Sequence, residues 1–126
     1  MRELLIVGAG GFLGAISRYW LSGWVHRWAG SGFPWGTLAV NTIGCLVLGA
    51  LMALLETRVL VSPEARLFLG IGVLGSLTTF STFGYETLEL VRRSEFTLAA
   101  ANAAGSLLLG LGAVVVGRVL VRWMVA

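Results

Sequence analysis

Four long hydrophobic runs, separated by short polar connections, occupy most of the chain. They cover about residues 4–24, 38–55, 67–90 and 96–121. A helix needs about 20 predominantly apolar residues to cross a bilayer, so the runs are of the length that spans it. The pattern predicts an all-α membrane protein with four transmembrane helices per chain. We expect residues 1–126 to form a single membrane domain.

Helix-start signals precede two of these runs. Ser62, Pro63 and Glu64 provide an N-cap, a proline at the first helical position and an acid in the first turn. Thr37, just before the second run, is also expected to be an N-cap. The N-terminus has a charged start and an apolar run, as a signal peptide does, but the run continues past Arg18. We therefore expect a retained first span.

Hydroxyl side chains and two phenylalanines interrupt the third run between Gly75 and Phe83. A polar group in hydrocarbon needs an internal partner or costs several kcal/mol, so a segment that only spanned the membrane would not contain them. The Gly75-Ser76 pair at the start of this segment weakens a helix. The pattern predicts that the third helix is broken near Gly75–Ser81 and that the break forms a site that binds or passes a small ion.

The composition is that of an integral membrane protein. The chain of 126 residues is 57% hydrophobic and only 12% charged, whereas soluble domains carry about 25% charged residues. The net charge of +3 is the difference between nine basic and six acidic residues, and the basic residues, all arginine, are scattered at loop ends. We therefore expect no nucleic acid partner. Cys45 is the only cysteine, which excludes an intrachain disulfide and a thiolate metal cluster.

The motifs of hydrolytic, redox and metal catalysis are missing from the sequence. It contains no HExxH, no paired CxxC, no GxGxxG after a strand and no Ser-His-Asp set, and His26 is its only histidine. We therefore expect no enzymatic activity and no organic cofactor.

The arginines are divided almost evenly between the two sides of the predicted membrane domain. Five lie on the side of the termini, and the other side has four, or three if Arg18 counts as intramembrane. Such a weak bias does not fix one orientation by the positive-inside rule. The charges are therefore compatible with dual insertion and an antiparallel homodimer. A single protomer of four helices is also small for enclosing a conduit.

Several side chains inside the spans have two interpretations each. Arg18 either reaches the nearby interface or faces a water-filled mouth that concentrates anions. Asn41 either forms an interhelical hydrogen bond or donates to an anion in a pore. Phe80 and Phe83 either pack in the core or present their electropositive ring edges to an anion. Nearby hydroxyls can donate to the same ion, and carbonyls freed by the break can hold a cation.

Three motifs, in this order, resemble those of the small bacterial fluoride channels called Fluc or CrcB. They are residues 10–19 (GGFLGAISRY), 36–41 (GTLAVN) and 75–83 (GSLTTFSTF), so the resemblance covers nearly the whole chain. It implies a fluoride-selective channel for passive fluoride efflux, formed by an antiparallel, dual-topology homodimer with two pores and a central structural sodium ion. It also implies a multi-pass protein of the bacterial cell (inner) membrane.

The resemblance assigns roles to particular residues. The implied fluoride path contains Phe80, Phe83, Asn41, Ser81, Thr82 and Ser106. Arg18 resembles the family's vestibule arginine, and Gly75 and Thr78 match the positions whose backbone carbonyls hold the sodium ion. Glu86 matches a family carboxylate whose role is open.

The chain departs from the family pattern at three positions. Ser76 replaces a usual second glycine, Asn102 an aromatic residue of some members, and Gly110 a serine of a polar track. A small multidrug or cation antiporter also has four spans and dual topology, but it needs a carboxylate in its first span, where this chain has Arg18. A structural subunit would not need polar groups in three spans. We therefore expect the fluoride channel.

Overall fold

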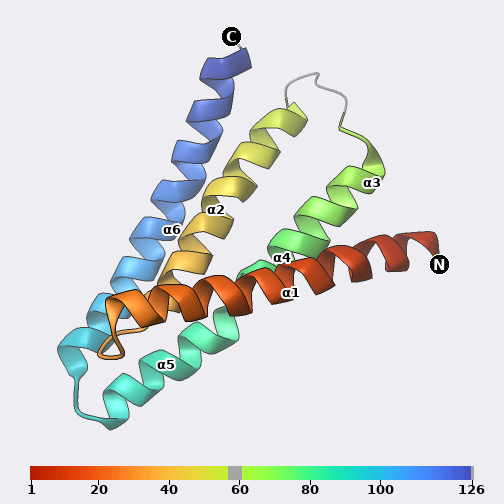
Figure 1. Cartoon of the computed structure of the whole chain (residues 1–126). Coiled ribbons are helices and arrows are strands. Elements are labelled where there is room, and N and C mark those ends of the chain that lie inside the picture. Colours follow the sequence, from red (N-terminus) through yellow and green to blue (C-terminus); the bar gives the residue numbers. More distant parts are fainter. Residues whose placement is uncertain (57–60, 126) are drawn as a thin grey trace.

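All secondary structure is helical in residues 1–56 and 61–125, the part of the chain that the computed structural model describes (Figure 1). The segments are α1 (Arg2–Ala29), α2 (Trp35–Glu56), α3 (Pro63–Arg66), the π-helix η1 (Leu67–Leu74), α4 (Gly75–Leu77), α5 (Phe80–Arg92) and α6 (Phe96–Val125). Within these residues, four stretches are long and apolar enough to cross a membrane: α1, α2, Pro63–Arg92 and α6. The predicted all-α membrane fold with four spanning helices is therefore confirmed.

The four stretches are not a simple parallel bundle. In Figure 1, α2 and α6 lie side by side along most of their length, whereas α1 runs across α2 and the third stretch. The crossing brings α1 against η1 and α4, directly before the point where the third stretch is interrupted. The middle of α1 therefore lies over the segment that carries the candidate site.

The two predicted helix starts have different outcomes. Ser62 caps α3 as predicted, because its Oγ accepts a hydrogen bond from the backbone N–H of Ala65 at 3.1 Å and Pro63 is the first helical residue. The prediction for Thr37 is wrong. Helix α2 begins at Trp35, and Thr37 is buried inside the helix, where its hydroxyl serves a side chain of another element.

The third stretch is broken at Thr78 and Thr79. Both residues have extended backbones, with φ −80° and ψ 155° at Thr78 and φ −150° and ψ 116° at Thr79. The helix therefore stops after Leu77 and restarts at Phe80, so α5 is a separate helical segment (Figure 1). The break lies inside the predicted window, so this prediction is confirmed.

Glycines let α1 and the third stretch approach backbone to backbone. A Cβ on Gly72 would lie 2.8 Å from the Cα of Gly10, which is closer than real Cβ atoms come. Positions 11 and 14 of α1 are also glycine, and a Cβ on Gly14 would lie 3.0 Å from the Cβ of Ser76. Ser76 replaces the expected second glycine, and it fits because α1 is lined by small residues there.

Helices α2 and α6 also approach closely through glycines. A Cβ on Gly49 would collide with the carbonyl of Val114, and a Cβ on Gly117 with the carbonyl of Leu46. In lipid, helices associate mainly through such close packing, because the tails are as apolar as the side chains. The contact between α2 and α6 therefore depends on these small residues.

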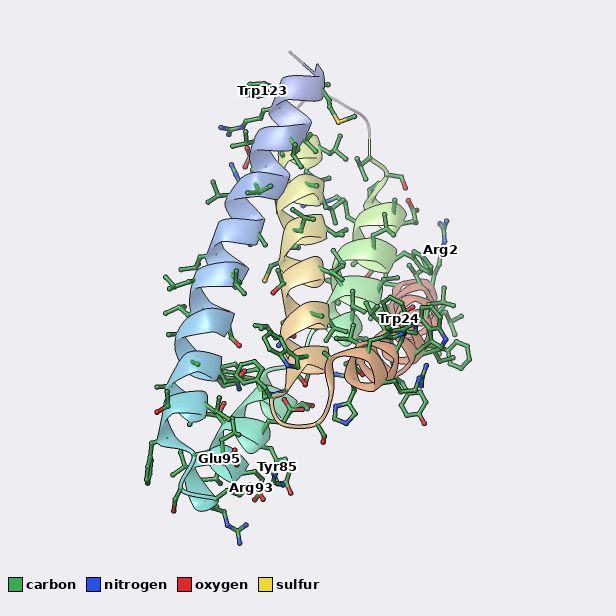
Figure 2. All side chains as sticks on the ribbon, turned by 60° about the vertical axis from the view of Figure 1, so that its left-hand side comes forward. Arg2, Trp24, Tyr85, Arg93, Glu95 and Trp123 are labelled. Carbon is green, nitrogen blue, oxygen red and sulfur yellow. The ribbon has the colours of Figure 1, made fainter. Side chains whose placement is uncertain are left out.

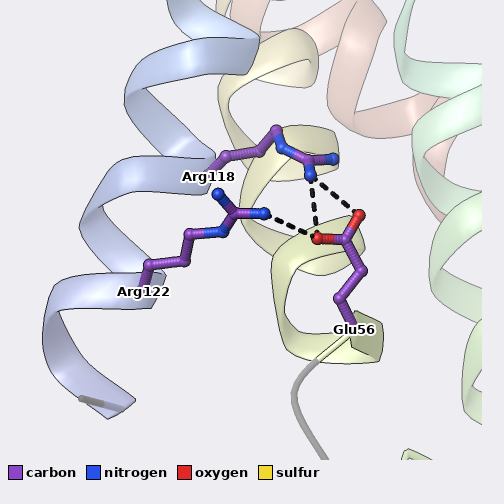
Figure 3. A network of polar contacts seen from close by, with 3 residues as sticks. All are labelled: Glu56, Arg118 and Arg122. Atoms are coloured by element: carbon purple, nitrogen blue, oxygen red, sulfur yellow. Dashed lines mark hydrogen bonds and ion pairs between the residues drawn. The ribbon is translucent and has the colours of Figure 1, made fainter.

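An ion-pair network joins the far ends of α2 and α6 (Figure 3). Arg118 Nη2 lies 2.8 Å from both carboxylate oxygens of Glu56, and Arg122 Nη2 lies 3.1 Å from Oε2 of the same residue. All three side chains are partly exposed, so the ion pairs are screened and contribute modestly. They fix the relative rotation of the two helix ends.

Most of the large apolar side chains of the protomer lie on its outside. The buried core cluster consists of three leucines, Leu51, Leu74 and Leu77. By contrast, side chains project from every helix in Figure 2, and Leu108 of α6 is 69% exposed. In Figure 2, Tyr85, Arg93 and Glu95 lie at one end and Trp123 at the other, whereas Arg2 and Trp24 lie between them. This surface suits lipid or a second apolar surface rather than water.

We expect Gly117→Ala to destabilise the protein by about 1–3 kcal/mol, the usual cost of overpacking. The added Cβ would collide with the Leu46 carbonyl and lie 2.9 Å from the backbone nitrogen of Ala50. Gly112→Ala is the matched control on α6, because no atom of a neighbouring element among the described residues lies within 4 Å of its Cβ position. Thermal unfolding in detergent measures both variants, and equal melting temperatures would contradict the close contact of α2 and α6.

Candidate functional site

The break in the third stretch is held by a side chain of α2. Asn41 Nδ2 donates to the carbonyl oxygen of Thr79 at 3.0 Å, and the N–H of Thr79 donates to Asn41 Oδ1 at 2.7 Å. The amide thus satisfies both backbone groups of an extended residue in a segment where water is scarce. One hydrogen of the Asn41 amide nitrogen is used in this pair, and the other is available to a ligand.

Hydroxyl groups cap the two helix ends at the break. Thr78 Oγ1 donates to the carbonyl oxygen of Leu74 at 3.0 Å, at the end of the first half of the span. Thr79 Oγ1 accepts from the N–H of Thr82 at 3.2 Å, which makes Thr79 the N-cap of α5. Thr79 Oγ1 also lies 3.0 Å from Thr82 Oγ1 and 3.3 Å from Ser81 Oγ. The hydroxyls of Thr78, Thr79, Ser81 and Thr82 therefore have internal partners.

Two kinds of backbone group meet at the break. In a continuous helix the N–H of Thr79 would donate to the carbonyl of Gly75, but here it donates to Asn41, so Gly75 loses that donor. On the other side, the first N–H groups of α5 have no partner within their helix, and the positive end of its dipole points the same way. The carbonyl end of the first half of the span and the amide end of α5 are therefore separated by only two residues.

A cavity of about 470 Å³ lies beside the break. It brings together six residues that were predicted for the fluoride path or the cation site, namely Asn41, Gly75, Thr78, Phe80, Phe83 and Ser106. The centroids of the two phenylalanine rings are 5.5 Å apart, with 43° between the ring planes. None of the described residues that line the cavity is charged. An ion in it would meet ring edges and neutral polar groups.

A second cavity, of about 230 Å³, lies on the other side of Thr79. Its polar lining includes Arg18, Thr37 and Thr82. Arg18 is half-buried, and its Nη1 lies 3.5 Å from the carbonyl oxygen of Thr78, at the long limit of a hydrogen bond. A positive charge therefore lies next to the break, in a hollow separate from the charge-free cavity.

Ser81 lines neither of these two cavities. Its side chain is exposed, and its hydroxyl lies near Thr79 Oγ1. Thr79, by contrast, lines both cavities and is 8% exposed. Thr79 was not predicted as a site residue. Its pattern, a threonine three residues before a second threonine and next to a helix break, matches an N-cap and was the available signal.

Thr37, which lines the second cavity, also forms a polar contact with Glu86. Thr37 Oγ1 donates to Glu86 Oε1 at 2.8 Å, which joins α2 to α5. Glu86 Oε2 is buried and has no hydrogen-bond partner among the residues that the structure describes. A third cavity, of about 210 Å³, lies at Glu86 and also includes His26 and Arg93 in its lining. Sequence reasoning missed Thr37 as a partner of Glu86 because it interpreted Thr37 as a cap.

The two departures in the fourth run have different environments. Asn102 is 1% exposed, and its Nδ2 donates to Thr87 Oγ1 at 2.9 Å, so it joins α6 to α5 rather than lining the large cavity. Gly110 lines that cavity next to Cys45. The replacement at 110 therefore removes a hydroxyl from the cavity wall, whereas Asn102 supports the helix that carries Phe80 and Phe83.

Comparison with known proteins identifies close relatives along almost the whole chain. The family model described as "CrcB-like protein, Camphor Resistance (CrcB)" matches residues 5–118. The "Fluoride-specific ion channel FluC" of Oceanobacillus iheyensis is 47% identical over 117 residues, which are 93% of this chain and 89% of the relative. The protein of the same name from Geobacter metallireducens is 42% identical over 122 residues, 97% of this chain and 98% of the relative.

A further relative, "Fluoride-specific ion channel FluC 3" of Methanosarcina barkeri, is 43% identical over 118 residues, 94% of this chain and 89% of the relative. These relatives are named as ion channels rather than enzymes. Together with four apolar spanning helices, the matches define a multi-pass membrane protein of a transport family. The chain belongs to the family of CrcB-like proteins.

Proposed function

We propose that the chain forms a fluoride-selective channel, which lets fluoride leave the cell passively across the cell membrane. The observation that carries the proposal is the charge-free cavity beside the break, lined by two phenylalanine rings, an amide and a hydroxyl. The names of the relatives, fluoride-specific ion channels, support the same ion. The whole chain, residues 1–126, acts as one membrane domain in this proposal.

The cavity offers weak and neutral contacts to an anion. Ring edges of Phe80 and Phe83 are electropositive, Ser106 has a hydroxyl donor, and Asn41 has one N–H left after its bond to Thr79. Conduction needs binding that is favourable enough to replace water but weak enough for the ion to leave. A set of neutral donors meets both conditions, whereas a fixed cation in the cavity would hold fluoride too tightly.

The second cavity supplies the approach to this path. Arg18 concentrates anions there, and Thr82 lines the same hollow. Ser81 and Thr82 lie in the first turn of α5, whose positive dipole end favours an anion. Fluoride thus passes from the arginine mouth to the neutral cavity along the hydroxyls of the break.

The pore-forming unit in this proposal is an antiparallel, dual-topology homodimer with two pores. Phe80 is 83% exposed and Leu107 is 62% exposed, yet both line the large cavity. A wall made of exposed side chains needs a further surface to enclose an ion path. A second copy of the chain, inserted in the opposite direction, supplies that surface and repeats the path.

The break also suits a structural sodium ion between two protomers. The Gly75 carbonyl has lost its helical donor, and the Thr78 carbonyl has only the long contact with Arg18. Carbonyls at unwound helix segments hold sodium in other membrane proteins. Among the described residues, no three acidic, histidine or cysteine side chains lie together, so a cation needs neutral oxygens. The same two carbonyls of a second copy complete the set.

We expect liposomes that carry the purified protein and are loaded with fluoride to release fluoride far faster than empty liposomes. A fluoride electrode measures the release, and chloride-loaded liposomes test selectivity. Efflux no faster than in liposomes without protein would contradict the channel.

We expect Phe80→Ile and Phe83→Ile each to slow fluoride efflux by about fivefold, because ring-edge contacts of about 1 kcal/mol are lost while the volume is nearly kept. Phe12→Ile is the matched control. Phe12 is an exposed ring on α1, away from the cavity. Liposome efflux measures the rate, and size-exclusion chromatography checks that the dimer persists. Unchanged efflux in both variants would assign the two rings to packing alone.

We expect the dimer to depend on sodium. Exchange of sodium for a large organic cation throughout purification removes the ion that the Gly75 and Thr78 carbonyls are proposed to share, so their like dipoles repel. The dimer fraction in detergent should fall and recover when sodium is returned. Potassium at equal ionic strength is the control for salt. A dimer that ignores the exchange would contradict the sodium site while leaving the fluoride path untouched.

A further inference from the structure

The helical hydrogen bonding of the first half of the third span ends at a single residue. The N–H of Thr78 still donates to the carbonyl of Leu74 at 3.1 Å, as in a regular helix. The next N–H, that of Thr79, turns away from Gly75 and donates to Asn41 Oδ1 at 2.7 Å. The regular ladder therefore ends at the residue where a side chain of α2 takes the place of the helical acceptor.

Asn41 matches the groups it replaces. A carboxamide has an acceptor oxygen and N–H donors, the same kinds of group as a peptide unit, and Asn41 uses both kinds toward Thr79, at 2.7 and 3.0 Å. Thr42, the next residue, donates instead to Leu38 within its own helix at 2.7 Å. Of these two neighbouring polar side chains, Asn41 is the one committed to the break.

The surface of α2 is shaped for the same contact. Gly44 lies one turn after Asn41, and a Cβ there would collide with the methyl group of Thr78. Thr79 is buried against the same helix. The extended residues of the break therefore lie against the backbone of α2 at Gly44, which has no side chain, and next to the Asn41 amide.

We propose that Asn41 is a positioning residue that keeps the third span broken. In its absence, the N–H of Thr79 returns to the Gly75 carbonyl and the helix becomes continuous from α4 to α5. One amide on α2 thereby controls both ends of the break, the free carbonyl of Gly75 and the free N–H groups at the start of α5. What those groups bind rests on the proposed function, but the opening of the helix does not.

The experiment is NMR spectroscopy of the full-length, detergent-solubilised protein, with backbone carbon shifts and amide exchange recorded at Thr78 and Thr79. In the parent, we expect extended shifts at Thr79 and slow exchange of its amide in fluoride-free buffer. In Asn41→Leu, which keeps the volume without the hydrogen bonds, we expect helical shifts at both residues. Thr42→Ala, the neighbouring control, keeps extended shifts. Asn41→Asp retains the acceptor and is expected to keep them as well.

Two outcomes would overturn the proposal. Extended shifts at Thr79 in Asn41→Leu show that the break does not need the amide. Fast exchange of the Thr79 amide in the parent would show that Asn41 does not hold this amide. This measurement needs no variant, so it tests the proposal even if Asn41→Leu fails to fold. A purely anion-binding role for Asn41 predicts unchanged backbone shifts in every variant and amide exchange at Thr79 that slows when fluoride is added.

A functional readout separates this inference from the proposed function. If sodium binds at Gly75, Asn41→Leu should raise the sodium concentration needed for the dimer by about tenfold, the effect of losing one or two hydrogen bonds. Asn41→Asp should raise it less. Absence of fluoride efflux from the parent protein would defeat the proposed function, while the backbone shifts would still decide the role of Asn41.

Discussion

The bilayer offers no hydrogen-bond partners, and the design of this chain follows from that one constraint. A helix satisfies its own backbone, so each break in a membrane helix needs partners from elsewhere in the protein. Here Asn41 supplies both partners for Thr79, and the hydroxyls of Thr78 and Thr79 cap the two helix ends. With the break stabilised in this way, carbonyl and amide groups become available at mid-membrane, which a continuous helix would have used internally.

Local sequence patterns were sufficient to predict the spanning helices and the break. They could not predict the partners of polar side chains, because those depend on tertiary contacts. The hydrophobic runs and the hydroxyls near Gly75 predicted four spans and the break. The partners of individual polar groups depend on residues far apart in sequence, such as Asn41 and Thr79, which are separated by 38 positions. For the same reason Thr37 was interpreted as a cap, because nothing local indicates Glu86, 49 positions away. The π-helical turns from 67 to 74 likewise have no local signature.

Charge and neutrality are divided between neighbouring hollows. Arg18 lies in the cavity on one side of Thr79, whereas the described residues that line the larger cavity on the other side are all uncharged. An arginine attracts anions over several ångströms, and a neutral site releases them easily. Thr79 is the shared wall, so an ion that moved from one hollow to the other would pass its hydroxyl. This arrangement favours throughput over tight binding, as a channel requires.

The protomer is an incomplete structure for such a path. Its buried core cluster contains only three leucines among the described residues, and Phe80, central to the proposed path, is 83% exposed. Burial of apolar surface does not drive association in lipid, because the tails solvate leucine as well as another helix does. In the proposed dimer, the second copy would therefore be held by close packing and by polar contacts. Carbonyls released at the break and bridged by a cation would provide such a contact, next to the phenylalanine rings that need a second surface. The interruption of the third span would then produce both the dimer contact and the ion path.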